Sequence, residues 1–209
     1  MASTTAGRAG RQPLVLVVPA TLDLHGRAVL CHHHNTPIEV SVTIYADYTP
    51  EEQQQLRASL AAAAVAVSAA SPGRKEETVS EGVAAARVIL ESGPDYVANT
   101  LVTSVIREVE RRVKTEQPVP DFVEAASAVG ARETALEALR AVASLLASRS
   151  TPEEAAGYKT WLMRIAAATA EAGKEDQGFL GRGGVQVNKV EQAALREIAA
   201  VLELDPTGA

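Results

Sequence analysis

The chain has 209 residues, of which 46% are hydrophobic but only 3% aromatic, and its formal net charge is −6. No apolar run approaches the roughly 20 residues of a membrane-spanning helix, and an acidic surface repels phosphate backbones, so we expect neither a membrane protein nor a nucleic-acid partner. The single cysteine, Cys31, allows no internal disulfide and indicates a reducing, cytoplasmic setting. The apolar content is mostly alanine, the best helix former, which predicts an all-α fold.

The first 35 residues differ in composition from the rest. Met1–Gln12 is small, basic and polar, and the apolar run PLVLVVPATL follows it. A secretory signal peptide is one interpretation, but Pro19 breaks the run and no clear small-x-small cleavage site follows. We therefore expect a flexible N-terminal extension over residues 1–35, with a short strand at Leu14–Val18 at most. Residues 36–209 then form a single helical domain.

One segment has the alternation of a β-strand. In Ile38–Tyr45 the apolar side chains fall on one face and the polar ones on the other. A lone strand is unstable, so it must pair with Leu14–Val18, pack on the helices or stay loose. The sequence thus predicts a short β-like N-terminal element, which is also able to add to a partner's sheet.

Strong start and stop signals divide the remaining chain into helices. The tetrapeptide Thr-Pro-Glu-Glu occurs at Thr49 and again at Thr151. In each copy threonine caps the helix, proline takes the first position, and the second glutamate reaches back to the cap. Breakers lie between the other segments. We expect a bundle of six or seven helices at about 50–70, 76–91, 94–116, 120–148 with a break at Gly130, 151–172 and 188–203.

Three of these segments have a recognisable apolar face. Their periodic residues predict which sides point into the core. Trp161, the only tryptophan, is expected to be buried against the last helix. The three faces consist of Val97, Leu101, Val105, Val109 and Val113; of Tyr158, Trp161, Leu162 and Ile165; and of Val190, Ala194, Ile198 and Val201/Leu202.

Histidine and cysteine are confined to the start of the chain. From Thr49 onward there is neither residue, so the helical region lacks the commonest general base, a thiol nucleophile and soft metal ligands. The tract Cys31–His34 resembles a metal-binding sequence. However, adjacent residues point in different directions and no second cluster completes a tetrahedral site, so adventitious Ni²⁺ or Zn²⁺ binding is the alternative.

A glycine-rich loop, Gly173–Val187, precedes the last helix. It matches neither a Walker A loop nor the dinucleotide fingerprint nor an EF-hand. One interpretation is a site for an anion or small ligand, with Lys189 assisting. The other is a glycine cap and tight turn with a structural role. The ligand-binding residues would be Lys174, Gly178, Gly181, Arg182, Gly183 and Gly184.

Acidic residues gather around the same loop. Glu171, Glu175, Asp176 and Glu191 would converge at the mouth of the helical hairpin. Oxygen-only ligands suit Ca²⁺, Mg²⁺ or Mn²⁺. The alternative is a solvated helix end in which Glu191 caps the last helix. No other cofactor is expected.

The C-terminal part resembles the helical tellurite-resistance TerB-like proteins. The resemblance covers about 50 residues: a small-residue helix, an acidic and glycine-rich loop, Val185–Val187, and a helix with Glu191, Leu195 and Ile198. It implies a compact helical bundle that is metal-associated and linked to stress.

These observations lead to two functional hypotheses. The first is a non-catalytic, bacterial-type helical protein that acts by binding a protein or a small ligand. The alternative is a hard-metal-binding stress protein, or a metal-dependent enzyme that uses the carboxylates near the loop.

Overall fold

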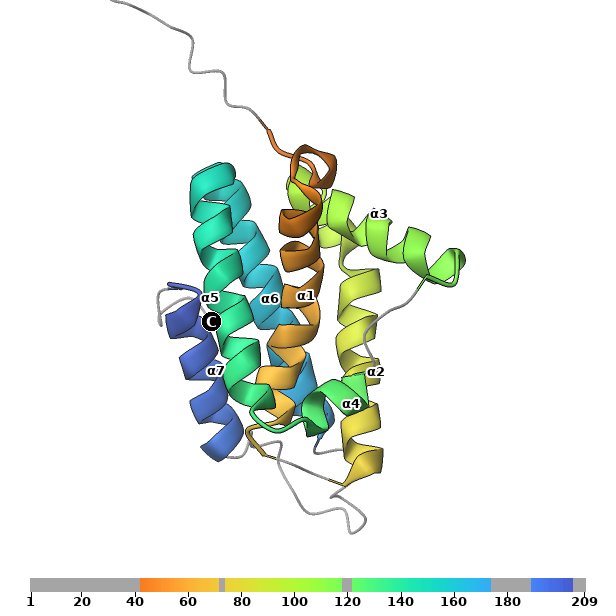
Figure 1. Cartoon of the computed structure of the whole chain (residues 1–209), viewed down its shortest axis with the longest axis vertical. Helices are drawn as coiled ribbons and strands as arrows, with labels where there is room; N and C mark the ends of the chain where they lie inside the picture. The colour runs from red at the N-terminus through yellow and green to blue at the C-terminus, as the bar shows by residue number, and fades with distance from the viewer. Residues whose placement is uncertain (1–41, 72–73, 118–121, 174–188, 205–209) are drawn as a thin grey trace, which may run out of the picture. The chain divides into compact units, whose positions relative to one another are not determined.

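The computed structural model describes residues 42–71, 74–117, 122–173 and 189–204, all within one compact unit, Val40–Ala209. In these residues the chain is helical and has no strand, which confirms the predicted all-α bundle (Figure 1). The elements are η1 (Tyr45–Asp47), α1 (Pro50–Ser68), α2 (Lys75–Glu91), η2 (Gly93–Tyr96), α3 (Thr100–Lys114), α4 (Phe122–Ser127), α5 (Ala131–Arg149), α6 (Pro152–Ala172) and α7 (Lys189–Val201), where η marks a short 3-10 helix.

Helix α1 lies at the centre of the bundle (Figure 1). It packs most extensively against α5 and α6 and also contacts α2, α4 and α7. Every residue from Ala62 to Ser68 is buried, so this half of the helix is surrounded on all sides. Four of those seven residues are alanine, whose small side chain lets neighbouring helices approach closely. The alanine bias of the sequence therefore allows many helices to pack around one.

The two repeated tetrapeptides start the two helices that pack together in the core. Thr49 Oγ1 accepts a hydrogen bond from the backbone N–H of Glu52 at 3.3 Å, and the Glu52 carboxylate accepts one from Thr49 N at 2.8 Å. The corresponding bonds between Thr151 and Glu154 both measure 3.2 Å. Both capping boxes are thus confirmed, and they fix the starts of α1 and α6.

The predicted break at Gly130 is also confirmed. Gly130 separates α4 from α5 and has a φ of 72°, in the left-handed region that favours glycine. A side chain at this position would strain the backbone, although no heavy atom lies within 4 Å of where its Cβ would be.

The apolar faces predicted for two helices need correction. Asn99 caps α3 by accepting a hydrogen bond from Val102 N at 3.0 Å, so the helix starts at Thr100 instead of 94. Val97 therefore precedes the helix and is 74% exposed, and Val113 is 54% exposed. The buried face consists of Leu101, Val102, Val105 and Ile106. In α7, Val190 is exposed, whereas Ala194, Ile198 and, just after the helix, Leu202 are buried as predicted.

The predicted strand is wrong where the structure describes it. Residues 42–44 have no regular structure, and Tyr45 starts a 3-10 helix. The reason is that backbone N–H groups here bond to side chains instead of a second strand. Thr43 N donates to Glu154 Oε1 at 2.9 Å, and Tyr45 N donates to Ser104 Oγ at 2.8 Å. Residues 38–41, the proposed partner strand and the extension over 1–35 lie outside the described residues.

An aromatic cluster forms the heart of the core. Tyr158, Trp161, Leu162 and Ile165 are all fully buried, as their spacing predicts. The Trp161 ring contacts Tyr158 edge-on at 5.5 Å and Tyr96 of η2 at 6.4 Å between ring centroids. Trp161 is expected from the sequence to pack against the last helix. Helix α7 does pack on α6, the helix that carries Trp161, but the ring contacts of Trp161 are with Tyr96 and Tyr158. Its Nε1 is buried and has no hydrogen-bond partner among the described residues, whereas the Tyr158 hydroxyl donates to Leu56 O at 2.8 Å.

Trp161→Ala should lower the free energy of unfolding by about 3–5 kcal/mol, because it removes a fully buried aromatic ring. Trp161→Phe should cost much less, because the lost N–H group has no partner to leave unpaired. Urea denaturation followed by far-ultraviolet circular dichroism measures both. Equal losses in the two variants would contradict this packing.

Gly130→Ala should destabilise the protein by about 1 kcal/mol or more, because alanine is strained at positive φ. Gly93→Ala is the matched control, since Gly93 has no positive φ and open space around it. Thermal melts of the two variants compare them directly. A Gly93 variant as unstable as the Gly130 variant would argue against backbone strain as the cause.

Candidate functional site

Helix α2 lies at one side of the bundle, where it packs against α6, α1, α4 and α3 (Figure 1). Its N-terminus is fixed by Glu77, whose carboxylate accepts a hydrogen bond from Arg74 N at 2.9 Å and forms an ion pair with the Arg74 side chain at 3.1 Å. These bonds hold the pKa of Glu77 below its ordinary value. The buried residues of α2 are Glu77, Thr78, Glu81 and Ala85.

The opposite face of α2 is apolar and exposed. Val79 is 45% exposed, Val83 55% and Leu90 40%, and Ala86 is exposed as well. Their spacing of i, i+4, i+7 and i+11 places them in one line along the helix. We call these four residues the α2 stripe.

The fully buried positions of α2 thus have the reverse of the usual polarity, while Val88 and Ile89 of the same helix are partly buried and pack against the core. Polar groups normally face water, and burial of a carboxylate disfavours its charged form, but here three of the four buried residues are polar. Single exposed apolar residues are common on protein surfaces and need no explanation. A continuous line of them opposite buried carboxylates is different, because contiguous apolar patches mark interaction sites. The α2 stripe is therefore the best candidate for an interaction surface in the described part of the chain.

The buried face of α2 contributes to a second feature, at the end of the bundle where α1 and α6 finish. Glu81 and Glu191 of α7 are 6% and 7% exposed, and both point at Gly173, the C-terminal cap of α6. A Cβ atom on Gly173 would lie 2.8 Å from Glu81 Oε1 and 3.8 Å from Glu191 Oε1. These two oxygens are therefore no more than about 6.6 Å apart, the sum of the two distances. Ser68, the last residue of α1, donates a hydrogen bond to Glu81 Oε2.

The surroundings of Glu81 disfavour its charged form. Burial raises the pKa of this carboxyl most, the carboxylates of Glu191 and Glu77 raise it further, and the hydrogen bond from Ser68 opposes them. At the upper limit of about 6.6 Å, two full charges would repel by roughly 2–3 kcal/mol at an effective dielectric constant of about 20. A protonated Glu81 avoids this repulsion.

The residues predicted to bind a ligand or metal are only partly described. Lys174, Gly178, Gly181, Arg182, Gly183, Gly184, Glu175 and Asp176 lie outside the described residues, so these assignments stay predictions. Of the predicted metal ligands, Glu171 is exposed and Glu191 is buried beside Glu81. Within the four described ranges, no group of three or more histidine, cysteine, aspartate or glutamate residues is placed to hold a metal ion.

Sequence reasoning missed Glu81 and the α2 stripe. A signal for both was present, because residues 77, 81 and 85 share one face of a helix and residues 79, 83, 86 and 90 share another. Periodicity shows which residues share a face of the helix, but it does not show which face points to the core. The usual expectation, that the apolar face packs on the core, would have placed Val79, Val83, Ala86 and Leu90 inside.

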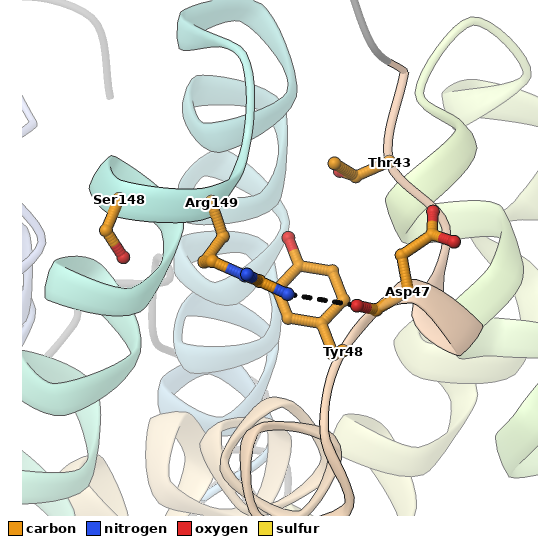
Figure 2. A pocket seen from close by; sticks show the side chains of 5 residues that line it. All are labelled: Thr43, Asp47, Tyr48, Ser148 and Arg149. Carbon is orange, nitrogen blue, oxygen red and sulfur yellow. Dashed lines mark hydrogen bonds between the residues drawn. The ribbon is translucent and has the colours of Figure 1, made fainter.

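A shallow hollow of about 280 Å³ lies beside the start of α1, lined by Thr43, Asp47, Tyr48, Ser148 and Arg149 (Figure 2). Arg149 lies over the Tyr48 ring, with 5.8 Å between its guanidinium carbon and the ring centroid, and donates to Asp47 O at 3.0 Å. It also pairs with Glu52 at 3.6 Å. Because Arg149 is already engaged by groups of this chain, we interpret the hollow as the joint between the segment before α1 and the end of α5.

Charged residues on the exposed face of α3 pair with one another. On α3, Glu108 forms ion pairs with Arg111 and Arg112, both at 2.8 Å. Lys114 lies 3.9 Å from Glu110. None of the helices in the described ranges is both long and apolar enough to cross a membrane.

Comparison of the chain with protein-family models, with curated proteins and with solved structures gives no match. The resemblance to TerB-like proteins therefore stays a prediction, and functional inference depends on the geometry described above.

Proposed function

We propose that this chain is a non-catalytic helical protein that binds a partner protein through the α2 stripe. The single observation that supports this proposal is the reversed polarity of α2. Val79, Val83 and Leu90 each leave 40% or more of their surface exposed. Covering these side chains would contribute about 25 cal/mol for each Å² of apolar surface removed from water. A partner thus gains from a surface that the fold itself leaves uncovered.

The shape of the α2 stripe favours an α-helix as the partner element. Its spacing is that of a coiled-coil seam, in which residues of one helix insert between those of another. Ala86 lies within the stripe and Gly82 beside it, and their small size permits close approach of a second helix backbone. Exposed charges of both signs, Arg87 and Glu91, flank the C-terminal half and would form a polar rim. We therefore expect an amphipathic helix that presents apolar residues at matching positions.

Two other hypotheses from the sequence stay open. Small-ligand binding by the glycine-rich loop and hard-metal binding by the acidic residues depend mainly on residues 174–188, which are outside the described ranges. The proposal based on α2 depends on residues 75–91 alone. A bacterial, stress-linked role is implied by the TerB-like resemblance alone, and the crosslinking experiment does not depend on it.

Site-specific photo-crosslinking in cells of the source organism tests the proposal. A photoreactive amino acid at Val83 should give a discrete crosslinked product, whereas the same residue at Arg140, an exposed position on α5, should not. Mass spectrometry of the product should place the crosslink in an amphipathic helix. Leu90→Glu, introduced beside the probe at position 83, should abolish the product because it puts a charge into the apolar seam.

The Leu90→Glu variant must still fold for the loss of crosslinking to be informative. Leu90 is part of the exposed face, so we expect Leu90→Glu to alter the melting temperature little. A crosslink to this chain itself, with a dimer in light-scattering measurements, would make the partner a second copy. Binding through the α2 stripe would be refuted if the photoreactive amino acid gave the same crosslinked products at positions 83 and 140. It would also be refuted if the product from position 83 persisted in the Leu90→Glu variant.

A further inference from the structure

We propose that α7 is a releasable cover of the bundle, and that the ion pair between Lys159 of α6 and Glu203, which follows α7, is the clasp that closes it. The clasp uses neither face of α2, so the proposal is independent of the α2 stripe. Helix α7 packs against α1, α5 and α6, on the other side of the bundle from α2 (Figure 1). Release of α7 would therefore uncover a second surface of the fold.

Lys159 is a cation at a position where a charge is costly. The residue is only 9% exposed, and its Nζ donates a hydrogen bond to Glu203 Oε2 at 3.2 Å. Burial of an ammonium group disfavours folding unless a carboxylate or another acceptor replaces the lost water. Glu203 supplies that carboxylate from beyond the C-terminal end of α7. The docked position of α7 is therefore what keeps Lys159 paired.

Glu203 occupies a backbone position that favours glycine. Its φ is 55°, in the left-handed region. Glu203 N donates to Ala200 O at 3.1 Å. Leu204 N donates to Ala199 O at 3.0 Å, which completes the Schellman motif that ends many helices. A side chain strains the backbone at this position, so the sequence keeps a less stable residue here, and the ion pair with Lys159 is the gain that accompanies it.

The end of α3 has the same motif without a clasp. Glu116 has a φ of 51°, and its N–H donates to Val113 O at 3.3 Å. Gln117 N donates to Arg112 O at 3.0 Å. Glu116 is exposed, and its side chain forms no ion pair with a described residue. The two glutamates thus share the backbone strain and differ in the ion pair, which makes Glu116 an internal control for Glu203.

The attachment of α7 depends on few large side chains. The buried apolar residues within the helix are Ala194, Ile198 and Ala199, and buried Leu202 follows the helix. Alanine buries little apolar surface, so Ile198 and Leu202 supply most of the hydrophobic contribution. A helix of 13 residues is also marginal in water on its own. We therefore expect α7 to open locally while the rest of the bundle stays folded.

Two ion pairs shift this local equilibrium. Arg132 of α5 pairs with Glu197 of α7, and the two side chains are 34% and 39% exposed, so this pair contributes little. In the clasp, the Lys159 side chain is 11% exposed and that of Glu203 is 75% exposed. Loss of the clasp leaves a buried charge unpaired, which makes it the stronger of the two. Its exposed carboxylate nevertheless lets salt screen it.

Hydrogen–deuterium exchange of the full chain, followed by nuclear magnetic resonance, tests the clasp. The Leu202 amide, which donates to Ile198 O at 2.9 Å, reports on α7, and the amide of buried Leu146 in α5 is the reference. Glu203→Gly should lower the protection of Leu202 by about tenfold or more relative to Leu146, because the unpaired Lys159 disfavours docking. Raising the salt concentration to about 1 M, where the Debye length is about 3 Å, should lower this protection in wild type but not in Glu203→Gly.

Two further variants separate the clasp from the backbone strain. Lys159→Met keeps an apolar stem and removes the charge. In that background, Glu203→Gly should raise the protection of the Leu202 amide, because the change then relieves strain and breaks no ion pair. Glu116→Gly relieves the same kind of strain at the end of α3. It should leave the protection of Leu202 unchanged relative to that of Leu146.

Higher protection of Leu202 in Glu203→Gly alone would show that residue 203 only ends the helix, and would overturn the clasp. Equal losses at Leu202 and Leu146 would also overturn it, because α7 would then not open separately from the bundle. If Lys159→Met does not fold, the salt series decides the question. Protection of Leu202 in wild type that is the same at low and high salt would refute the proposal, and a loss that is absent from Glu203→Gly would support it.

Discussion

The packing of α1 determines the arrangement of the other helices. Its second half is buried on all sides, so other helices must surround it, and their positions leave α2 at one side of the bundle (Figure 1). Alanine makes this possible because a small side chain permits close contact without a large cavity. It also limits the apolar area that each contact buries. The aromatic cluster of Tyr96, Tyr158 and Trp161 adds the large buried surface that alanine does not supply.

Helix α2 is where the sequence departs from what folding alone would favour. A helix of ordinary polarity would place Val83 inward and Glu81 outward, and would gain stability from both changes. Places where a sequence breaks the rules of folding are expected to be functional. The proposed function interprets the exposed apolar face of this helix as a surface that binds a partner.

The features that sequence predicted correctly have local causes. Two capping boxes, the break at Gly130 and the burial of the Tyr158–Ile165 face each depend on residues a few positions apart. The failures depend on contacts between distant segments. The predicted strand failed over residues 42–45, the part of it that the structure describes, because Glu154 and Ser104 bond the backbone of residues 43 and 45. Glu81 and Glu191 both lie near Gly173 although they are 110 positions apart, and periodicity carries no information about such an arrangement.

Cysteine accessibility along α2 tests the orientation of this helix most directly. In a Cys31→Ser background, single cysteines at positions 79, 81, 83, 85, 86 and 90 are labelled with a maleimide under native conditions. We predict rapid labelling at 79, 83, 86 and 90 and slow labelling at 81 and 85, with equal rates once the protein is unfolded. Rapid labelling at 81 and 85 with protection at 83 and 90 would show that α2 has ordinary polarity, and would contradict the proposed binding surface.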